Sequence, residues 1–337
     1  MQIEVDSIYR YRKTMQSIGF TLLIFLAFIN LFGLLAGGLE ELLLLLEVDK
    51  VTSEVGYQLF YGAGYLAAFM LPVIFLKKML RKAGFANQPM RTSPGLSPWL
   101  PLILFAGIAV ILATAYLNAT MVSIFSFFDF GKTFPQSTGN EPWYSVVLTF
   151  LVLCLVPAVC EEFLFRGAIL TNLLPFGRAN AILVSALLFG LMHQNFAQFF
   201  YAFCAGIVLG LVYERTGSIW NCIFLHLVNN TYSIFEEQLE KAFGNLFSPL
   251  ALSVLELSIF AIGMVSAVIL ILRFAPRRQS FSEGIFEKEV PVSDSYSIVQ
   301  IPVKTRIKSF FNVPMIIFLI LAVLEALVVV FLLPFFS

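Results

Sequence analysis

The stretch that decides the fold is Cys160-Glu161-Glu162-Phe163-Leu164-Phe165-Arg166-Gly167, which places two carboxylates and a guanidinium in a long apolar segment. If residues 145–174 form one helix, it is about 45 Å long at ~1.5 Å per residue, and Glu161 lies near its middle. Ionisable residues inside a membrane are costly and usually face the protein interior, so they indicate function. The stretch therefore predicts a membrane helix with a functional polar centre.

The spacing of the three charged residues separates their roles. Glu162 and Arg166 are four residues apart, so on a helix they share a face and can form an ion pair. Glu161 points about 100° away from Glu162 on the same helix. Its carboxylate would then be free to act as a general base or acid. The alternative is an ion triad that only fixes helix packing.

The composition restricts the class of protein. The chain has 337 residues, of which 59% are hydrophobic and only 12% are charged. These values exclude an ordinary soluble domain and a disordered chain. The net charge of zero gives no indication of a nucleic-acid partner. We predict an all-α, polytopic membrane helix bundle with a polar catalytic cavity within the bilayer and about nine spans, at residues 18–35, 56–76, 99–116, 145–174, 179–193, 196–213, 218–232, 252–272 and 313–335.

These spans divide into three segments. Residues 1–140 hold spans one to three, residues 141–235 form the catalytic core with spans four to seven, and residues 236–337 hold the last two spans with a cytoplasmic loop at 273–310. With the N-terminus inside, 17 of the 21 lysines and arginines lie on inner segments and 3 on outer ones. This bias predicts a cytoplasmic N-terminus. We expect a multi-pass protein, in contact with lipid, in the cytoplasmic membrane of a bacterium.

Both histidines of the chain, His193 and His226, fall in predicted spans. Asn230 is four residues after His226 and shares its helix face. A lone buried histidine is usually a packing residue. Two histidines, a free Glu161 and an asparagine on three neighbouring spans instead favour one polar pocket that reaches into the bilayer.

Three motifs in this order carry a resemblance to a known family. The set is similar to that of the CAAX-protease and bacteriocin-processing (CPBP, also called Abi) family of intramembrane proteases, and it reads Glu161-Glu162-x-x-x-Arg166, Phe189-x-x-x-His193 and His226-x-x-x-Asn230. The resemblance covers residues 145–232. It implies an endopeptidase built as a helical bundle with a cavity open to the cytosol.

The resemblance also implies a role for each motif residue. Glu161 resembles the glutamate that activates the attacking water, assisted by His193. His226 and Asn230 resemble the pair that holds the tetrahedral oxyanion, a task for which donors preorganised in a water-poor site are suited. By the same resemblance, the glutamate at position 162 orients the arginine at position 166.

A metal requirement is left open by the sequence. Catalytic zinc has three protein ligands and an open position, and Glu161, His193 and His226 could supply the ligands across helices. The HExxH motif is absent. Family members include annotated metalloproteases, and a metal-free glutamate mechanism is also argued for the family. We keep both possibilities and prefer no tightly bound metal.

The leading hypothesis is an intramembrane endopeptidase that cuts a hydrophobic, membrane-associated or lipidated (prenylated) peptide with a glutamate-activated water. One alternative is a proton-coupled transporter, because buried glutamate and histidine can relay protons. The sequence gives no sign of the inverted repeats that are typical of transporters. The other alternative is a non-catalytic scaffold or bacteriocin-immunity protein. The intact motif set argues against it, because buried polar groups are costly in a membrane.

Overall fold

The computed structural model describes residues 2–85, 88–93, 98–126, 142–244, 249–274 and 301–331, which are helical with short connections and include no strand. Within these ranges, five helices are long and apolar enough to cross a membrane, and the bent pair α11–α12 makes a sixth if it is one span. The chain is therefore an all-α, multi-pass integral membrane protein. The predicted number of about nine spans is not confirmed.

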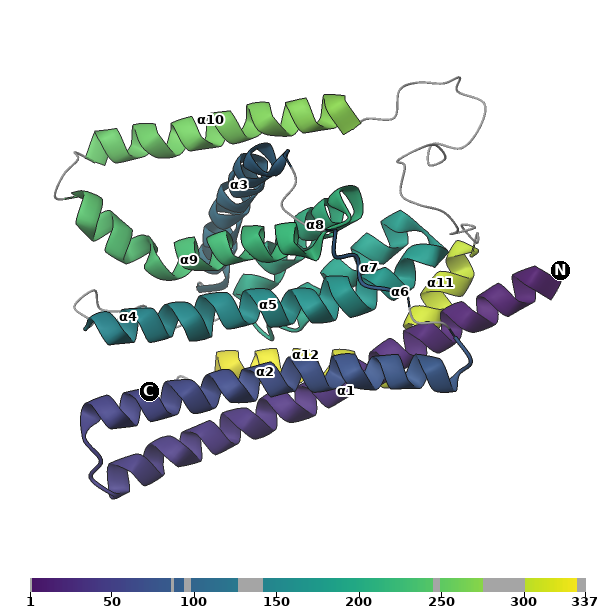
Figure 1. Cartoon of the computed structure of the whole chain (residues 1–337), viewed down its shortest axis with the longest axis horizontal. Coiled ribbons are helices and arrows are strands. Elements are labelled where there is room, and N and C mark those ends of the chain that lie inside the picture. The colour runs from purple at the N-terminus through teal and green to yellow at the C-terminus, as the bar shows by residue number, and fades with distance from the viewer. Residues whose placement is uncertain are drawn as a thin grey trace.

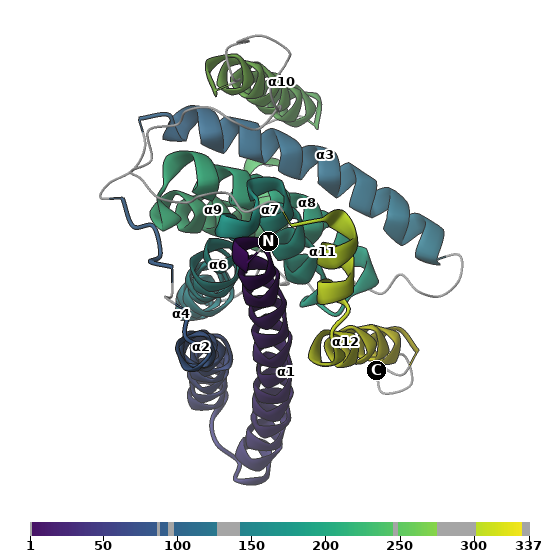
Figure 2. The ribbon, with the colours of Figure 1, turned by 90° about the vertical axis from the view of Figure 1, so that its right-hand side faces the viewer.

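The helices form three layers (Figures 1 and 2). The middle layer holds the segment from α4 to α9, on which all the motif residues lie. The helices α1 (Gln2–Leu45), α2 (Lys50–Lys82) and α12 (Val313–Phe331) cover one side of it. The helices α3 (Leu100–Ser126) and α10 (Pro249–Phe274) cover the other side. The middle layer is thus enclosed by helices from both ends of the chain.

A continuous helix at residues 143–176 carries the central charged stretch, close to the predicted bounds of 145–174. Two π-helical turns interrupt it on either side of the glutamates. Pro157 follows the first turn and has no backbone N–H, which a wider turn accommodates. The helix ends at Gly177, whose φ of 119° suits a residue without a side chain. Its segments are α4 (Trp143–Thr149), η1 (Phe150–Leu155), α5 (Val156–Glu162), η2 (Phe163–Leu170), α6 (Thr171–Leu173) and η3 (Leu174–Phe176).

The remaining helices of the middle layer are α7 (Arg178–Leu191), α8 (Phe196–Thr216) and α9 (Ile219–Gly244). Within the described residues, α3 and α7 count only as shorter apolar helices and α9 is not among the candidate spans, so three of the nine predicted spans are not supported. α7 and α8 pack closely because Gly206 has no side chain. A Cβ there would lie 2.9 Å from the Cα of Ala186.

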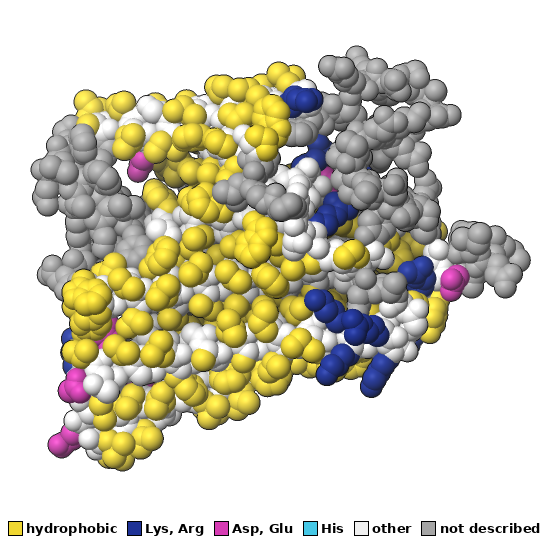
Figure 3. Space-filling model, viewed as in Figure 1, with side chains coloured by type: hydrophobic (Ala, Val, Ile, Leu, Met, Phe, Trp, Pro, Cys, Tyr) yellow, Lys and Arg dark blue, Asp and Glu magenta, His cyan; other side chains and the backbone are white. Residues whose placement is uncertain are grey.

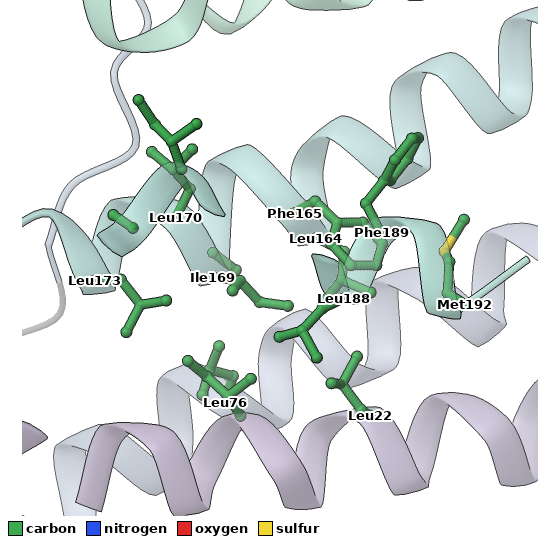
Figure 4. Packing of buried hydrophobic residues seen from close by; sticks show 14 of the residues in the cluster. Leu22, Leu76, Leu164, Phe165, Ile169, Leu170, Leu173, Leu188, Phe189 and Met192 are labelled. Carbon is green, nitrogen blue, oxygen red and sulfur yellow. The ribbon is translucent and has the colours of Figure 1, made fainter. Parts of the chain in front are cut away.

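The hydrophobic core joins α1 and α2 to the middle layer (Figure 4), and buried residues of α12 belong to the same cluster. Leu22 of α1 and Leu76 of α2 are fully buried and lie beside Leu164 and Ile169 of the central helix. At the start of α12, the chain approaches α1 at Gly19, where a Cβ would lie only 2.8 Å from the backbone nitrogen of residue 315. The core therefore needs α12 as well as the segment that carries the motifs.

The C-terminal part of the predicted loop at 273–310 is helical. It contains α11 (Val303–Phe310), which meets α12 at an angle of 62°. Residues 275–300 of that loop, and the end of the predicted last span at 332–335, lie outside the described residues.

The two ends of the bundle differ in charge (Figure 3). Basic side chains gather at the end that holds the N-terminus of α1 and the C-terminus of α2, and acidic side chains gather at the opposite end, around the connection between α1 and α2. α2 runs from the acidic end of the bundle to the basic end. Asp49 caps its first turn by accepting a hydrogen bond from the Thr52 N–H at 3.0 Å, and Lys77 to Lys82 close it. We refer to these as the acidic end and the basic end.

Candidate active site

The ion pair that the spacing predicts is confirmed, and it lies in the interior. Arg166 Nη1 donates to Glu162 Oε1 at 2.8 Å, and both side chains are 0% exposed. The other terminal nitrogen of Arg166 donates to the carbonyl of Gly206 on α8 at 3.1 Å. The guanidinium also lies over the Phe189 ring of α7, 4.5 Å from its centroid. This buried charge therefore ties the central helix to α7 and α8.

His226 of α9 lies between the two glutamates. Its Nδ1 is 2.8 Å from Glu162 Oε1, and its Nε2 is 3.7 Å from Glu161 Oε2. An ionised carboxylate can only accept, so Nδ1 carries the proton in that contact. The contact with Glu162 was not predicted from the sequence, because it joins residues on two helices. It orients the ring so that Nε2 faces Glu161.

Glu161 is separate from the arginine, as predicted, but it is not free of partners. Tyr65 of α2 donates its hydroxyl to Glu161 Oε1 at 2.5 Å. The other carboxylate oxygen, Oε2, is buried and has no hydrogen-bond partner among the described residues. One oxygen is therefore held by a neutral donor, and the other lies near His226 Nε2 without a hydrogen-bond partner among the described residues.

His193 does not lie in α7 as predicted but in the turn that follows it. Its Nδ1 is 2.8 Å from the carbonyl oxygen of Phe189. A carbonyl only accepts, so Nδ1 is the protonated nitrogen and Nε2 is the one left to accept a proton. The Phe189 ring makes edge contacts with both imidazoles. Its centroid lies 5.0 Å from that of His193 and 5.8 Å from that of His226.

Asn230 lies one turn beyond His226 on α9. Its amide donates to the carbonyl of Cys154, on the same helix as the glutamates, at 3.5 Å. The neighbouring Asn229 donates to Asn230 Oδ1 at 3.2 Å and accepts from the hydroxyl of Tyr201 on α8. This chain of contacts fixes the position of the asparagine amide next to the central helix.

One cavity of about 710 Å³ joins these groups. Glu161, His193, His226 and Asn230 line it together, so the structure brings four of the six predicted catalytic residues to one space. Glu162 and Arg166 are fully buried behind its wall. Helices α2, α3, α7, α8 and α9 and the central helix contribute the rest of the lining. The arrangement offers a carboxylate, two imidazoles and an amide to a ligand inside the bilayer.

The predicted zinc ligands do not form a preformed metal centre. In the part of the chain that the structure describes, no group of three or more His, Cys, Asp and Glu residues is arranged to hold a metal ion. His226 and His193 engage Nδ1 with Glu162 and with the Phe189 carbonyl, so Nε2 is the nitrogen of each ring that could face an ion. Three protein ligands are typical of catalytic zinc. We therefore derive no chemical step through a metal.

Comparison with known proteins finds a family that this site resembles. The family model described as type II CAAX prenyl endopeptidase Rce1-like matches residues 142–232. This segment is therefore similar to the Rce1-like family. It contains every predicted catalytic residue and corresponds to the helices from α4 to the first half of α9. The Rce1-like segment is thus the middle layer of the fold.

A curated relative agrees with this assignment. The Bacillus subtilis (strain 168) protein named "Putative membrane peptidase YdiL" is 31% identical over 93 residues. The match covers 27% of this chain and 37% of that protein, so the chain spans little more than a third of the relative. No solved structure matches the chain significantly. The comparisons therefore describe the Rce1-like segment and not the helices around it.

Sequence reasoning missed the residue that α2 supplies. Tyr65 is 96 positions from Glu161 and lies outside the Rce1-like segment. A signal was present, since Tyr57, Tyr61 and Tyr65 recur every four residues along a predicted span. Such spacing places the three rings on one helix face. It does not say which other helix that face meets.

Proposed function

We propose that the chain is an intramembrane endopeptidase that hydrolyses a peptide bond with a water activated by Glu161. The observation that carries the proposal is the environment of Glu161 in the cavity. Tyr65 holds one carboxylate oxygen, and the other is buried without a hydrogen-bond partner among the described residues and lies 3.7 Å from His226 Nε2. A positioned carboxylate of this kind suits general-base catalysis.

The proposed reaction has two steps. Glu161 takes a proton from water as the water oxygen bonds to the carbonyl carbon of the substrate, and the carbonyl becomes an oxyanion. Donors directed at that oxyanion lower the barrier. Asn230 Nδ2 is one donor, and His226 Nε2 is a second when the imidazole is protonated. The carbon–nitrogen bond then breaks, and the proton passes from Glu161 to the leaving amine.

The other three motif residues support this reaction. The Nε2 of His193 is free to accept a hydrogen bond from the attacking water, because Nδ1 is engaged by the Phe189 carbonyl. Glu162 and Arg166 hold the His226 ring and the wall of the cavity through the buried contacts described above. Their role in the proposal is to position His226.

The substrate in this proposal is a hydrophobic or lipidated peptide that reaches the bilayer interior. The cavity lies within a membrane protein and has an apolar wall that includes Val110, Ile111 and Leu153. The Rce1-like description and the peptidase name of the relative support a peptide substrate. We also propose a bacterial cytoplasmic membrane and a cytoplasmic N-terminus, which the gathering of basic residues at one end supports.

The test is proteolysis by detergent-purified protein of a quenched peptide library that includes prenylated peptides. Wild type should cleave, and Glu161→Ala should lose the general-base contribution of about 10²–10⁴-fold. The matched control is Glu325→Gln on α12, which removes a membrane carboxylate whose partner is Asn30 rather than the cavity. The control should retain activity. Wild-type cleavage that persists in Glu161→Ala would overturn the assignment of the base, and absence of cleavage by wild type would favour a transporter or an immunity protein.

A further inference from the structure

Helix α11 differs from the membrane-spanning helices in length and direction. It has 8 residues, so it is about 12 Å long at ~1.5 Å per residue, and it meets α12 at an angle of 62° (Figure 2). α12 has 19 residues with Glu325 as its one charged side chain, and its length of about 28 Å is close to the thickness of the hydrocarbon core. With α12 across the bilayer, α11 is inclined toward the membrane plane.

Polar contacts at both ends of α11 fix its position. The guanidinium of Arg306 lies against Gly177, the residue between the central helix and α7, where a Cβ would be 3.3 Å from Nη2. At the other end, Asn312 donates to the carbonyl of Ser309 at 2.9 Å and accepts from the backbone N–H of Met315 at 3.1 Å. Asn312 thus satisfies the end of α11 and the start of α12 together. The bend is therefore held in place, and α11 presents one defined face outward.

The outward face of α11 carries an apolar stripe. Val303, Ile307 and Phe311 are 70%, 55% and 54% exposed and recur every four residues, which places them on one side of the helix. Phe311 keeps the helical register at the C-cap, because its N–H donates to the Ile307 carbonyl at 3.2 Å. Lys304 and Lys308 are exposed and border the stripe. Apolar side chains flanked by two lysines therefore run the length of the helix.

The charge around this stripe has one sign. α11 contains two lysines and one arginine and no acidic residue, and α1 and α2 bring further basic side chains to the same end of the bundle. A basic amphipathic helix of this kind is typical of the membrane interface, where apolar side chains reach the headgroup–acyl boundary and cations meet anionic headgroups. A soluble anion would use the lysines and leave the stripe in water. The pattern therefore favours an anionic lipid surface.

We propose that α11 is a docking surface for the anionic lipids of the membrane face at the basic end. Val303, Ile307 and Phe311 insert at the boundary between headgroups and acyl chains, and Lys304 and Lys308 bind the headgroup phosphates. The residues described as lining the cavity include none from α11, so this surface is separate from the candidate active site. The inference does not depend on the proposed function.

The test follows a fluorophore on α11 in nanodiscs that hold the full chain. Ile307→Cys is labelled with an environment-sensitive nitrobenzoxadiazole, and wild type treated in the same way accounts for the four native cysteines. The discs contain phosphatidylcholine with rising fractions of phosphatidylglycerol. We expect the emission to move to shorter wavelength as phosphatidylglycerol rises. NaCl at about 1 M should weaken this shift, because it shortens the screening length to ~3 Å.

Lysine variants of the labelled protein identify the side chains that bind lipid. Lys304→Gln combined with Lys308→Gln should lower the apparent affinity for phosphatidylglycerol about 25-fold, since each lysine near an anionic surface contributes about fivefold. The matched control is Lys78→Gln combined with Lys82→Gln. It removes the same charge from two exposed side chains four residues apart on α2, at the same end of the bundle. The control should reduce the affinity much less.

Three results would overturn the proposal. An emission that does not respond to phosphatidylglycerol would exclude anionic lipid as the partner and favour an acidic protein segment. A shift already complete in pure phosphatidylcholine would show apolar contact without selection for charge. An equal loss of affinity in the two lysine pairs would assign the attraction to the basic end as a whole rather than to α11.

Discussion

Removal of the Tyr65 hydroxyl should slow the reaction without unfolding the protein. In Tyr65→Phe the ring remains, and it keeps its stacking on Phe69 at 4.7 Å and its contact with Tyr61 at 6.2 Å. The change removes only the 2.5 Å hydrogen bond to Glu161 Oε1. A hydrogen bond to a charged group contributes about 1.5–3 kcal/mol. Because 1.36 kcal/mol corresponds to a factor of ten in rate, kcat should fall about 10- to 150-fold.

The assay for this variant is steady-state cleavage of the peptide that wild type cuts best. We expect the loss in kcat, with KM close to wild type, since the hydroxyl orients the base and does not bind the substrate. Tyr11→Phe is the matched control. It removes a buried hydroxyl on α1 whose partner is Asn180 rather than a residue of the cavity, and its kcat should stay near that of wild type. A kcat for Tyr65→Phe within about threefold of wild type would refute the reasoning. Such a value corresponds to a change of less than ~0.7 kcal/mol in the activation free energy.

Three further predictions concern stability and metal dependence. Arg166→Met removes the guanidinium partner of the buried Glu162, which then keeps only His226, and it should cost about 3–5 kcal/mol in thermal unfolding. Glu162→Leu combined with Arg166→Met should recover most of that stability but not activity, and an Arg166→Met protein as stable as wild type would contradict this. Gly206→Ala should lower the stability by about 1–3 kcal/mol because its Cβ would press on Ala186, while Gly37→Ala, with nothing within 4 Å, should be neutral. Cleavage should survive treatment with EDTA, because the described residues present no three-ligand group; a loss that zinc restores would be the opposing result.

Local spacing predicted the parts of the site that lie on one helix. The bounds of the central helix and the ion pair between Glu162 and Arg166 follow from an apolar run and from an interval of four residues, and both are confirmed. The two π-helical turns at η1 and η2 were not predicted, because a wider turn leaves no distinct hydrophobic pattern. The catalytic roles of the motif residues stay predictions until activity is measured.

Contacts between helices could not be predicted from the sequence. The hydrogen bond from Tyr65 and the approach of His226 to Glu162 depend on which helix faces meet, and a periodic pattern identifies a face without identifying its neighbour. The count of about nine spans is unconfirmed for a related reason. An apolar run such as that of α7 indicates a buried helix. The same apolar side chains are typical of burial in protein and of burial in lipid, so the run does not distinguish the two. The division into segments 1–140, 141–235 and 236–337 stays a prediction.

The close approach of α12 to α1 at Gly19 affects when the helix bundle can assemble during synthesis. The ribosome completes the Rce1-like segment well before it reaches α12, so a nascent chain holds every motif residue while one side of α1 still lacks its cover. Met315 and Phe318 of α12 are fully buried in the finished core. Assembly of this part of the core therefore requires α12 to have inserted. A chain that stops after residue 232 would retain all six motif residues and still lack the packing that α12 provides.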